Sequence, residues 1–417
     1  MATWLIDSGT LTDIADAIRA KTGSAATIQV SDLATEIANL PSGGDTIEGV
    51  RNITALTTAG LNKGDRVQIS LGMLSTFSNP PTGTINRLAI NKAKTRLVAG
   101  LQASPYIAIY DLTTTPETKL TNPANLPGGT IKTVNFNDDG TLCAMGHSTS
   151  PYITVYDTTT TPWTKLADPA TLPASTANSL AFNKTGDRCI VGHNNSPYIT
   201  IYDTTTTPWT KLADPATLPG GTANYVTFSS DGAKAIVCWT TGTYIYDTST
   251  TPWTYTNSIS RAGVKTAIYF KNDTRLLLLH ASPYVSIYDT STYTEISGVL
   301  PKALDNGGNY MRLSDDETEV SLFTGDSTTK SMLLKLENDV ITYIRPYPIK
   351  NINDAIWKNK NIYVGRSAST YLQKYDATNL IASTYTSITQ DIIYKTLGYA
   401  KEDIGINQTG AAVEIFY

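Results

Sequence analysis

The chain has little charge and no long apolar run. Only 16% of its 417 residues are charged, the formal net charge is −4, and no cluster of Lys and Arg stands out. Nucleic-acid-binding and anionic-membrane-binding faces both need such a cluster, so we expect neither nucleic acid nor a membrane among the partners. No apolar run reaches 18 residues, so the sequence predicts no membrane insertion.

Export signals and disulfide frameworks are missing as well. The N-terminus, MATWLIDSGTL, has no basic segment and no long apolar stretch, so we expect synthesis in the cytoplasm without a signal peptide. The three cysteines cannot all pair. Cys143 and Cys189 stand 46 residues apart, and Cys238 falls in the matching segment of the next unit. We expect three buried thiols that act as small apolar side chains.

Motifs of the common enzymatic chemistries do not occur. The sequence contains no GxSxG, HExxH, P-loop or GxGxxG pattern. Acidic pairs stand at Asp138-Asp139 and Asp315-Asp316, where turn formation explains them. We therefore expect no enzyme, no catalytic residue, no metal site and no cofactor. A hydrolase with carboxylates placed around a pore is the enzymatic alternative.

One segment occurs three times almost unchanged. The chain reads SPYIAIYDLTTTPETKLTNPANLP from Ser104, SPYITVYDTTTTPWTKLADPATLP from Ser150 and SPYITIYDTTTTPWTKLADPATLP from Ser196. Equivalent residues of successive copies stand 46 positions apart. A fixed period in the forties is typical of a repeat architecture in which each unit packs on the next.

One period, residues 131–176, predicts four short strands and no helix. Polar and apolar residues alternate in IKTVNF and in YITVYD, while TLCAMGH is mostly apolar and WTKLA is short. The strands are separated by the turn-forming segments NDDG, STSP and TTTTP. Such a unit makes one four-stranded antiparallel sheet. A ring of these sheets, a β-propeller, buries the faces that one sheet cannot bury alone.

This pattern resembles the WD40 family of β-propellers. In that family the third strand of each blade ends in Trp-Asp, and here it ends in Tyr-Asp. The six pairs are Tyr110-Asp111, Tyr156-Asp157, Tyr202-Asp203, Tyr246-Asp247, Tyr288-Asp289 and Tyr375-Asp376. The Gly-His pair of the family is missing from its usual place. The resemblance therefore implies the architecture and not the partners of that family.

First strands are predicted near Ile85, Ile131, Ala177, Ala223, Val264, Asn309, Ile352 and Ile393. The sequence thus predicts a mostly β fold with an eight-bladed propeller over residues 66–417, or a seven-bladed one if the later units are miscounted. The last unit stops at Tyr417 after three strands, and residues 66–84 hold a strand without a unit. We expect this N-terminal strand to close the ring.

Residues 1–44 differ from the repeats and predict two short helices, over residues 10–23 and 31–41. Apolar residues share one face of each helix: Leu11, Ile14 and Ile18 in the first, Leu33 and Ile37 in the second. Two helices of this length cannot form a core alone, so we expect them to attach to other chains. Residues 45–65 are predicted to be a linker or lead-in strands.

The two stretches LTDIADAIRAKTGS and IQVSDLATEIANL resemble a helical module at the front of many virion proteins of tailed bacteriophages, above all tail-associated ones. An ordinary amphipathic hairpin is the alternative interpretation. The resemblance implies that the helices attach the chain to other virion proteins and that the protein is located in the virion. We also expect a homo-oligomer, with a trimer as the guess.

The three histidines, His147, His193 and His280, are candidates for contact with a ligand. Each ends a second strand just before a Ser-Pro-Tyr turn. They fall in three different units, so we expect no shared metal ion. The alternative is a polar side chain that satisfies its own turn.

Three tryptophans, Trp163, Trp209 and Trp253, are the second group of ligand candidates. Each follows Thr-Pro at the start of a fourth strand, where an exposed indole ring could stack on a sugar. Packing at the edge of a blade is the alternative. The first unit has Glu117 at this position, which we interpret as a sign that the fold does not require tryptophan there.

Two functions fit these observations. The first is a phage receptor-binding or tail-fibre protein, whose propeller binds a glycan of the bacterial surface while the helices hold it on the particle. Near-identical rims would offer several weak sites whose avidity multiplies. The second is a non-adhesive structural or decoration protein of the virion. A host intracellular scaffold is a third possibility, which leaves the front helices unexplained.

Overall fold

The computed structural model describes residues 4–6, 66–75, 77–281, 285–297, 310–314, 317–323, 331–346, 351–358, 361–385, 398–400 and 413–415. The chain divides into two compact units. One combines Met1–Leu74 with Tyr375–Tyr417, and the other is Ser75–Lys374, which contains the repeats.

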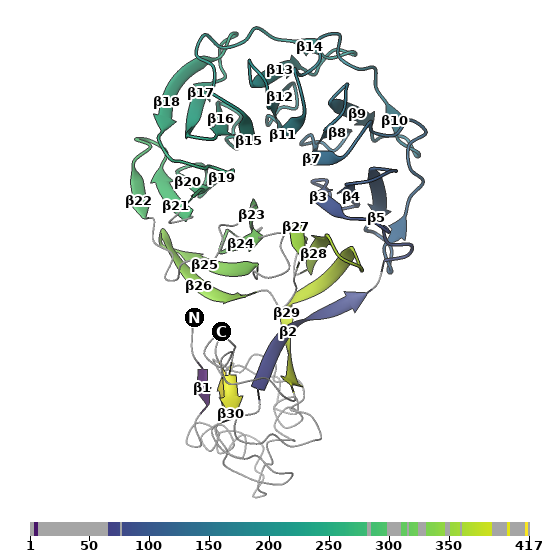
Figure 1. Cartoon of the computed structure of the whole chain (residues 1–417), viewed down its shortest axis with the longest axis vertical. Helices are drawn as coiled ribbons and strands as arrows, with labels where there is room; N and C mark the ends of the chain where they lie inside the picture. Colours follow the sequence, from purple (N-terminus) through teal and green to yellow (C-terminus); the bar gives the residue numbers. More distant parts are fainter. Residues whose placement is uncertain are drawn as a thin grey trace, which may run out of the picture. The chain divides into compact units, whose positions relative to one another are not determined.

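Small antiparallel sheets, one per repeat, are arranged around a common axis (Figure 1). Six have four strands, and the seventh is part of a larger sheet. The strands, sheet by sheet, are β3 (Ile85–Ile90), β4 (Arg96–Leu101), β5 (Ile107–Asp111) and β6 (Thr118–Lys119); β7 (Ile131–Phe136), β8 (Leu142–His147), β9 (Ile153–Asp157) and β10 (Thr164–Lys165); β11 (Ala177–Phe182), β12 (Arg188–His193), β13 (Ile199–Asp203) and β14 (Thr210–Lys211); β15 (Ala223–Phe228), β16 (Lys234–Trp239), β17 (Gly242–Asp247) and β18 (Thr254–Ile259); β19 (Thr266–Phe270), β20 (Arg275–Leu279), β21 (Val285–Asp289) and β22 (Glu295–Ser297); β23 (Tyr310–Leu313), β24 (Glu319–Phe323), β25 (Met332–Glu337) and β26 (Val340–Pro346); β27 (Ile352–Lys358), β28 (Asn361–Arg366) and β29 (Leu372–Tyr385).

The first strands of the sheets contact one another in a closed circle. Strand β3 contacts β7, and the sequence of contacts continues through β11, β15, β19, β23 and β27, which contacts β3 again. The predicted β-propeller of four-stranded antiparallel blades is therefore confirmed. We number the blades 1 to 7 from β3.

Seven blades close the ring, so the expectation of eight is wrong and its seven-bladed alternative is confirmed. The strand expected near Ile393 lies outside the described residues. The strands that follow it, β30 (Gly398–Ala400) and β31 (Val413–Ile415), form no blade because they pair with strands from the N-terminal part of the chain. They extend the sheet of blade 7 in the order β1-β31-β30-β2-β29-β28-β27, where β1 is Trp4–Ile6.

Strand β2 (Arg66–Ser75) stands next to β29 in the strand order of this larger sheet. Most of β2 and of β29 belongs to the unit outside Ser75–Lys374, so closure of the ring by an N-terminal strand stays a prediction.

The predicted helices over residues 10–23 and 31–41 lie outside the described residues, with their apolar residues Leu11, Ile14, Ile18, Leu33 and Ile37. Residues 45–65 lie outside them as well. The attachment role of the helices and the domain bounds 1–44, 45–65 and 66–417 therefore stay predictions.

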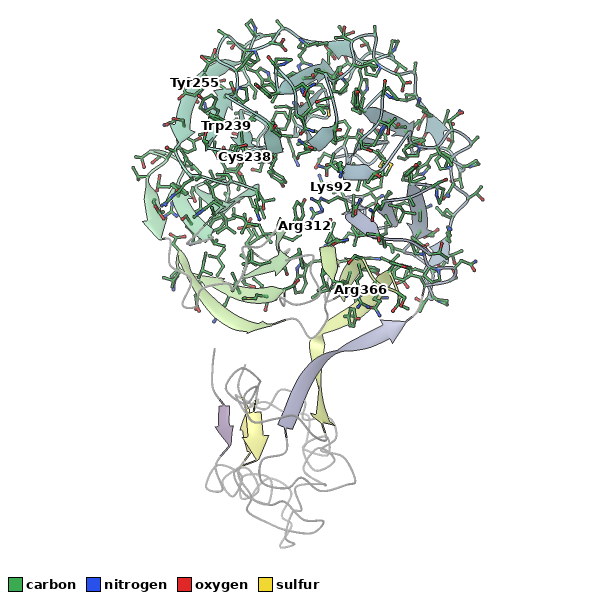
Figure 2. All side chains as sticks on the ribbon, viewed as in Figure 1. Lys92, Cys238, Trp239, Tyr255, Arg312 and Arg366 are labelled. Carbon is green, nitrogen blue, oxygen red and sulfur yellow. The ribbon has the colours of Figure 1, made fainter. Side chains whose placement is uncertain are left out.

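Apolar side chains between successive blades form the core. In β8, for example, every residue after Leu142 is buried. Cys143, Cys189 and Cys238 are buried in β8, β12 and β16, which confirms the prediction for the three thiols, and burial raises the pKa of each. Figure 2 shows how densely side chains fill the blades.

Glycine near the end of a second strand lets the next blade approach closely. A Cβ atom at Gly146 in blade 2 would lie 2.5 Å from Cγ2 of Thr133 and 2.9 Å from Cβ of Ala177 in blade 3. Gly365 holds the equivalent place in blade 7, where a Cβ atom would lie 2.6 Å from Cγ2 of Ile85 in blade 1. Only glycine leaves room for these side chains against the backbone of the second strand.

The Tyr-Asp pair at the end of a third strand ties together two connections. The hydroxyl of Tyr156 donates to the carbonyl of Asn125 at 2.8 Å, and Tyr110, Tyr202 and Tyr246 make equivalent bonds. Asp157 Oδ1 accepts from the backbone N–H of Thr159 at 2.8 Å and from its hydroxyl at 2.6 Å. The tyrosine anchors the connection before its blade, and the aspartate stabilises the following turn.

Candidate functional site

The inner strands place one residue of each blade at the same level around the propeller axis. In every blade this residue pairs with the fifth residue of the second strand, as Arg87 does with Gly100 and Tyr310 with Phe323. We call these seven residues the collar: Arg87, Thr133, Ser179, Tyr225, Thr266, Tyr310 and Asp354.

Hydrogen bonds between neighbouring blades hold the collar in place. The hydroxyl of Ser179 accepts from the backbone N–H of Val226 at 3.1 Å, and Asp354 Oδ2 accepts from the N–H of Leu88 at 2.9 Å. In four blades the asparagine before the collar residue donates to a carbonyl of the next blade: Asn86 to Ile131, Asn178 to Ala223, Asn224 to Val264 and Asn353 to Ile85. These bonds satisfy backbone groups that the inner strands leave unpaired.

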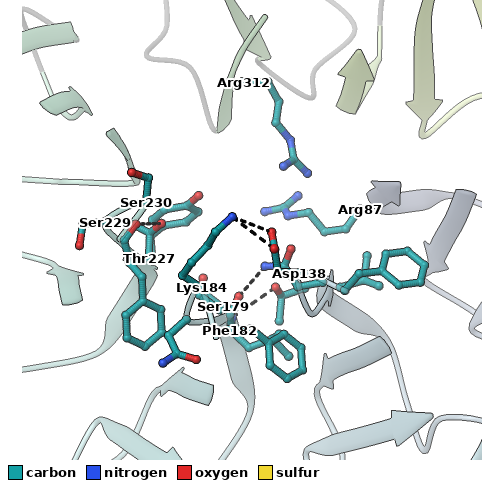
Figure 3. A pocket seen from close by; sticks show the side chains of 18 of the residues that line it. Arg87, Asp138, Ser179, Phe182, Lys184, Thr227, Ser229, Ser230 and Arg312 are labelled. Carbon is teal, nitrogen blue, oxygen red and sulfur yellow. Dashed lines mark hydrogen bonds and ion pairs between the residues drawn. The ribbon is translucent and has the colours of Figure 1, made fainter. Parts of the chain in front are cut away.

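A cavity of about 430 Å³ lies on one side of the collar (Figure 3). It extends toward the turns between first and second strands, where Asp138, Lys184 and Ser230 line it. We call it the turn chamber. Its volume is in the range that holds a small-molecule ligand.

A second cavity of about 300 Å³ lies on the other side of the collar. Asn178, Asn224 and Lys265 line it beyond the collar, and burial lowers the pKa of Lys265. We call it the loop chamber. Five collar residues line both chambers, so the two cavities meet there: Arg87, Thr133, Ser179, Tyr225 and Tyr310.

Arg312 and Asp354 form a buried ion pair beside the collar. Nη2 of Arg312 lies 3.0 Å from Oδ2 of Asp354, Nε lies 3.2 Å from Oδ1, and Nη2 also donates to the carbonyl of Leu88 at 3.0 Å. Asp354 is fully buried, while a quarter of the Arg312 side chain is exposed. Burial by itself lowers the pKa of Arg312, but the charge and hydrogen bonds of Asp354, together with the neighbouring tyrosines, outweigh it and the net pKa is raised.

Arg87 points into the same space without such a pairing (Figure 3). Its Cζ lies 4.4 Å from the ring centroid of Tyr310, and its Nη1 donates to the carbonyl of Asn86 at 2.7 Å. No carboxylate of the described residues pairs with it. The oxygens of Asp354 accept from Arg312 and from the N–H of Leu88 instead.

The chambers carry an excess of positive charge although the whole chain is negative. Arg87, Lys184, Lys265 and Arg312 line them, against the single carboxylate of Asp138 among the described lining residues. Asp138 is itself shared by two lysines, with Lys92 Nζ at 2.7 Å and Lys184 Nζ at 3.2 Å. These bonds hold the pKa of Asp138 below its ordinary value. The described part of the two chambers, which together we call the channel, is thus cationic, with a wall of hydroxyl, amide and phenol groups.

The three histidines lie away from these chambers and are buried. His147 and His193 have no exposed surface and His280 has 1%. Nε2 of His147 lies 3.0 Å from Oγ1 of Thr154, and His193 makes the same bond to Thr200. Burial is the main cause that lowers the pKa of all three, to about 4 for His147. A ligand role for them stays a prediction that their burial does not favour.

The three tryptophans are also inside the propeller. Trp163, Trp209 and Trp253 are each 3% exposed. Each packs edge-on against the phenylalanine at the end of its own first strand, as Trp163 does on Phe136 with ring centroids 5.8 Å apart. An indole ring in this position offers no open face for a sugar. Their role as ligand contacts stays untested, and we place the candidate site in the chambers.

In blade 1, Glu117 stands where blades 2 to 4 have tryptophan, and its side-chain partners belong to blade 7. Its Oε1 accepts from Nζ of Lys374 at 2.7 Å and from the hydroxyl of Tyr363 at 3.1 Å, at the contact between blades 1 and 7. Burial tends to raise the pKa of Glu117, but Lys374 outweighs it and the net pKa is lowered. Glu117 therefore forms an ion pair between two blades. Its presence in place of tryptophan carries no information on ligand binding.

Blade 5 contains a histidine, a serine and a glutamate in one hydrogen-bonded chain. Nε2 of His280 lies 2.8 Å from the hydroxyl of Ser286, which donates to Oε1 of Glu295 at 2.8 Å, and Glu295 also pairs with Arg261. A hydrolytic triad needs the acid on the far nitrogen of the histidine and an open serine. Here the acid binds the serine itself, and Ser286 is fully buried.

The described residues include no group of three or more His, Cys, Asp or Glu side chains placed to hold a metal ion. Among the same residues, no helix has both the length and the apolar character needed to cross a membrane.

No protein-family profile and no curated protein sequence matches the chain. Solved structures do match. A chain of Kuenenia stuttgartiensis hydrazine synthase has a TM-score of 0.56 at 10% identity, over 75% of this chain and 98% of that one. A chain of a mitotic checkpoint complex has a TM-score of 0.57 at 12% identity, over 81% of this chain and 99% of that one. At such identities the likeness shows the β-propeller fold alone.

The likeness to hydrazine synthase corrects the expectation that this chain is not an enzyme. A protein named as an enzyme shares the fold, so the lack of familiar motifs in the sequence does not exclude catalysis. The identity of 10% and the wide use of the fold assign no reaction either. Neither likeness bears on a phage or tail origin.

The collar and the chambers are the features that sequence reasoning missed. A signal was present, because the third residue of the inner strand changes from Arg87 to Thr133, Ser179 and Tyr225 while the segments around it repeat. A position that varies within near-identical repeats is free of the packing that fixes its neighbours. In a propeller such a position faces the axis, where blades of one chain contribute different side chains to one site.

Proposed function

We propose that this chain is a phage virion protein of the receptor-binding type, whose propeller binds a glycan of the bacterial surface. The observation that supports this best is the pair of chambers at the collar, with walls of Asn, Ser, Thr, Tyr and Arg side chains. Hydroxyl and amide groups recognise sugar hydroxyls, and phenol rings cover their apolar faces. The helices predicted for the front of the sequence, and its resemblance to a module of phage virion proteins, support attachment to other virion proteins.

A homo-oligomer, with a trimer as the expected state, would place several channels on one particle. Weak sites gain from this arrangement because a second bound site on the same particle raises avidity by orders of magnitude when the geometry allows. A structural or decoration protein of the virion is the second candidate, and it would use the same helices without binding to cells.

Binding of the labelled full-length protein to a panel of intact bacteria tests the proposal. We expect saturable binding to some strains and competition by surface glycans extracted from them. Binding to purified phage particles with no binding to any strain would contradict the receptor role and favour the decoration role. Tail or baseplate genes on either side of the coding sequence would support the virion assignment, and a setting without phage genes would count against it.

A further inference from the structure

Arg87 is placed in the channel as a guanidinium that still lacks an acidic partner among the described residues. Its neighbour Arg312 shows the contrast, since Asp354 neutralises it through both carboxylate oxygens. Arg87 has only a carbonyl and the face of Tyr310. A guanidinium presents five N–H donors in a planar fork that matches a carboxylate, and most of those donors are uncommitted here.

The loop chamber surrounds this guanidinium with groups of other kinds. Asn178 and Asn224 use their side-chain nitrogens as donors to the carbonyls of Ala223 and Val264. This orientation leaves their Oδ1 atoms as acceptors for hydroxyl donors, because no bond from the described residues reaches them. Tyr225 and Tyr310, whose rings pack at 64° with centroids 6.1 Å apart, add apolar surface. No described side chain that lines this chamber is acidic.

We propose that the loop chamber binds the carboxylate of an acidic sugar, such as a hexuronic acid, through Arg87. The carboxylate pairs with the guanidinium, the sugar hydroxyls donate to the amide oxygens of Asn178 and Asn224, and a ring face packs on the tyrosines. The chamber volume of about 300 Å³ fits one sugar residue and not an extended chain. This inference names the ligand class within the proposed glycan-binding function and rests on that function for its biological meaning.

Titration of the full-length protein with methyl β-glucuronide, followed by ligand-observed NMR and calorimetry, tests the inference. The neutral analogue methyl β-glucoside is the control ligand, and glucose 6-phosphate is the control anion. We expect the glucuronide to bind at least tenfold more tightly than the glucoside, with an affinity that falls as salt rises. Equal binding of acid and neutral sugar, or no binding of either, overturns the proposal. Tighter binding of the phosphate also overturns it, in favour of a phosphate site.

Variants locate the site. Arg87→Gln is expected to weaken glucuronide binding at least tenfold, while Lys132→Gln, which removes an exposed positive charge that lines neither chamber, leaves it unchanged. Equal effects of the two variants overturn the assignment to Arg87. The comparison of the two sugars on the unmodified protein holds even if Arg87→Gln fails to fold.

Cell binding separates this inference from the proposed function. If the protein binds bacteria but Arg87→Gln binds them equally and no acidic sugar binds, the inference fails and the receptor role stands. If the glucuronide binds through Arg87 but no strain binds the protein, the acidic-sugar site stands and the receptor role fails.

Discussion

Asp354 in blade 7 and Arg312 in blade 6 lie 3.0 Å apart, and the same carboxylate oxygen accepts the backbone N–H of Leu88 in blade 1. One fully buried side chain thereby joins three consecutive blades at the place where the ring closes. Its two oxygens take up the charge of Arg312 and one backbone donor, so that removal of the carboxylate leaves Arg312 without a counter-charge and the N–H of Leu88 without an acceptor.

We expect Asp354→Ala to lower the free energy of unfolding by about 3 kcal/mol, because it strands a partly buried guanidinium. Asp354→Asn should cost less, since its amide oxygen still accepts from Leu88. Denaturation in urea measures both. Asp168→Ala is the control, because Asp168 pairs with Lys165 at the surface and exposed pairs contribute less than about 1 kcal/mol. If Asp354→Ala lowered the free energy of unfolding no more than Asp168→Ala does, the contacts of Asp354 with the two neighbouring blades would not contribute to stability.

The second prediction concerns the ion pair at the outer side of the same contact between blades. Glu117→Gln removes the charge that Lys374 binds and should lower the free energy of unfolding by about 2 kcal/mol. Glu117→Trp gives blade 1 the residue of blades 2 to 4, and should be at least as destabilising because it buries Lys374 without an acceptor. Thermal unfolding of the two variants is the measurement. If Glu117→Trp were more stable than the unmodified protein, tryptophan would pack in blade 1 as well as it does in blades 2 to 4, and the ion pair would not be needed there.

Gly146 tests the close contact between blades 2 and 3. Gly146→Ala should lower the free energy of unfolding by about 1–3 kcal/mol, because the added methyl group overlaps Thr133 and Ala177. Gly83→Ala is the matched control, since nothing lies within 4 Å of a Cβ atom there, and should change stability by no more than about 0.5 kcal/mol. Urea denaturation of both variants measures the two changes in the free energy of unfolding. Equal and small changes would show that blades 2 and 3 can move apart to admit the methyl group.

Because burial lowers the pKa of the three histidines, we expect the folded protein to lose stability in mild acid. The pKa of His147 is about 4 in the folded chain and 6.5 ordinarily, so the unfolded chain takes up a proton between these values that the folded chain does not. Stability is therefore full above pH 6.5 and falls by about 3 kcal/mol as the pH drops toward 4. His193 and His280 add to this effect, because burial lowers their pKa too.

A double variant isolates the effect of one histidine. Blade 1 has Leu101 and Ala108 where blade 2 has His147 and Thr154, so His147→Leu with Thr154→Ala imports a pair that the fold already holds. We expect its stability to vary less between pH 6.5 and 4 than that of the unmodified protein. Unfolding curves at several pH values measure this, and an unchanged pH profile would place the titration elsewhere.

Much of the fold could be predicted from the sequence because the same pattern of strands and turns recurs in successive repeats. The fixed spacing from Pro105 to Pro151 and Pro197 sets the blade, and its turns and alternation set the four strands. The number of blades could not be predicted as safely. Strand propensity identifies β30 and β31 as strands, but their partners come from the far end of the chain, and no local pattern encodes that pairing.

The candidate site escaped prediction for a related physical reason. Histidine and tryptophan are the residues that ligands most often contact, yet in these repeats they fill gaps between sheets, as His147 does beside Thr154 and Trp163 beside Phe136. The collar is built from side chains of seven separate strands, so no short segment contains it. Arg87 and Arg312, which face each other there, are far apart in the sequence.

The sheet of blade 7 takes β2 from one end of the chain and β27 to β29 from the other. During synthesis, Ile85 leaves the ribosome long before its partner Asn353, which follows 268 positions later. At ordinary translation speeds blade 1 waits on the order of tens of seconds without the blade that packs on it in the closed ring. Nascent chains of this protein therefore pass through a window in which chaperones, rather than blade 7, cover that face of blade 1, and a stalled ribosome would release an aggregation-prone arc.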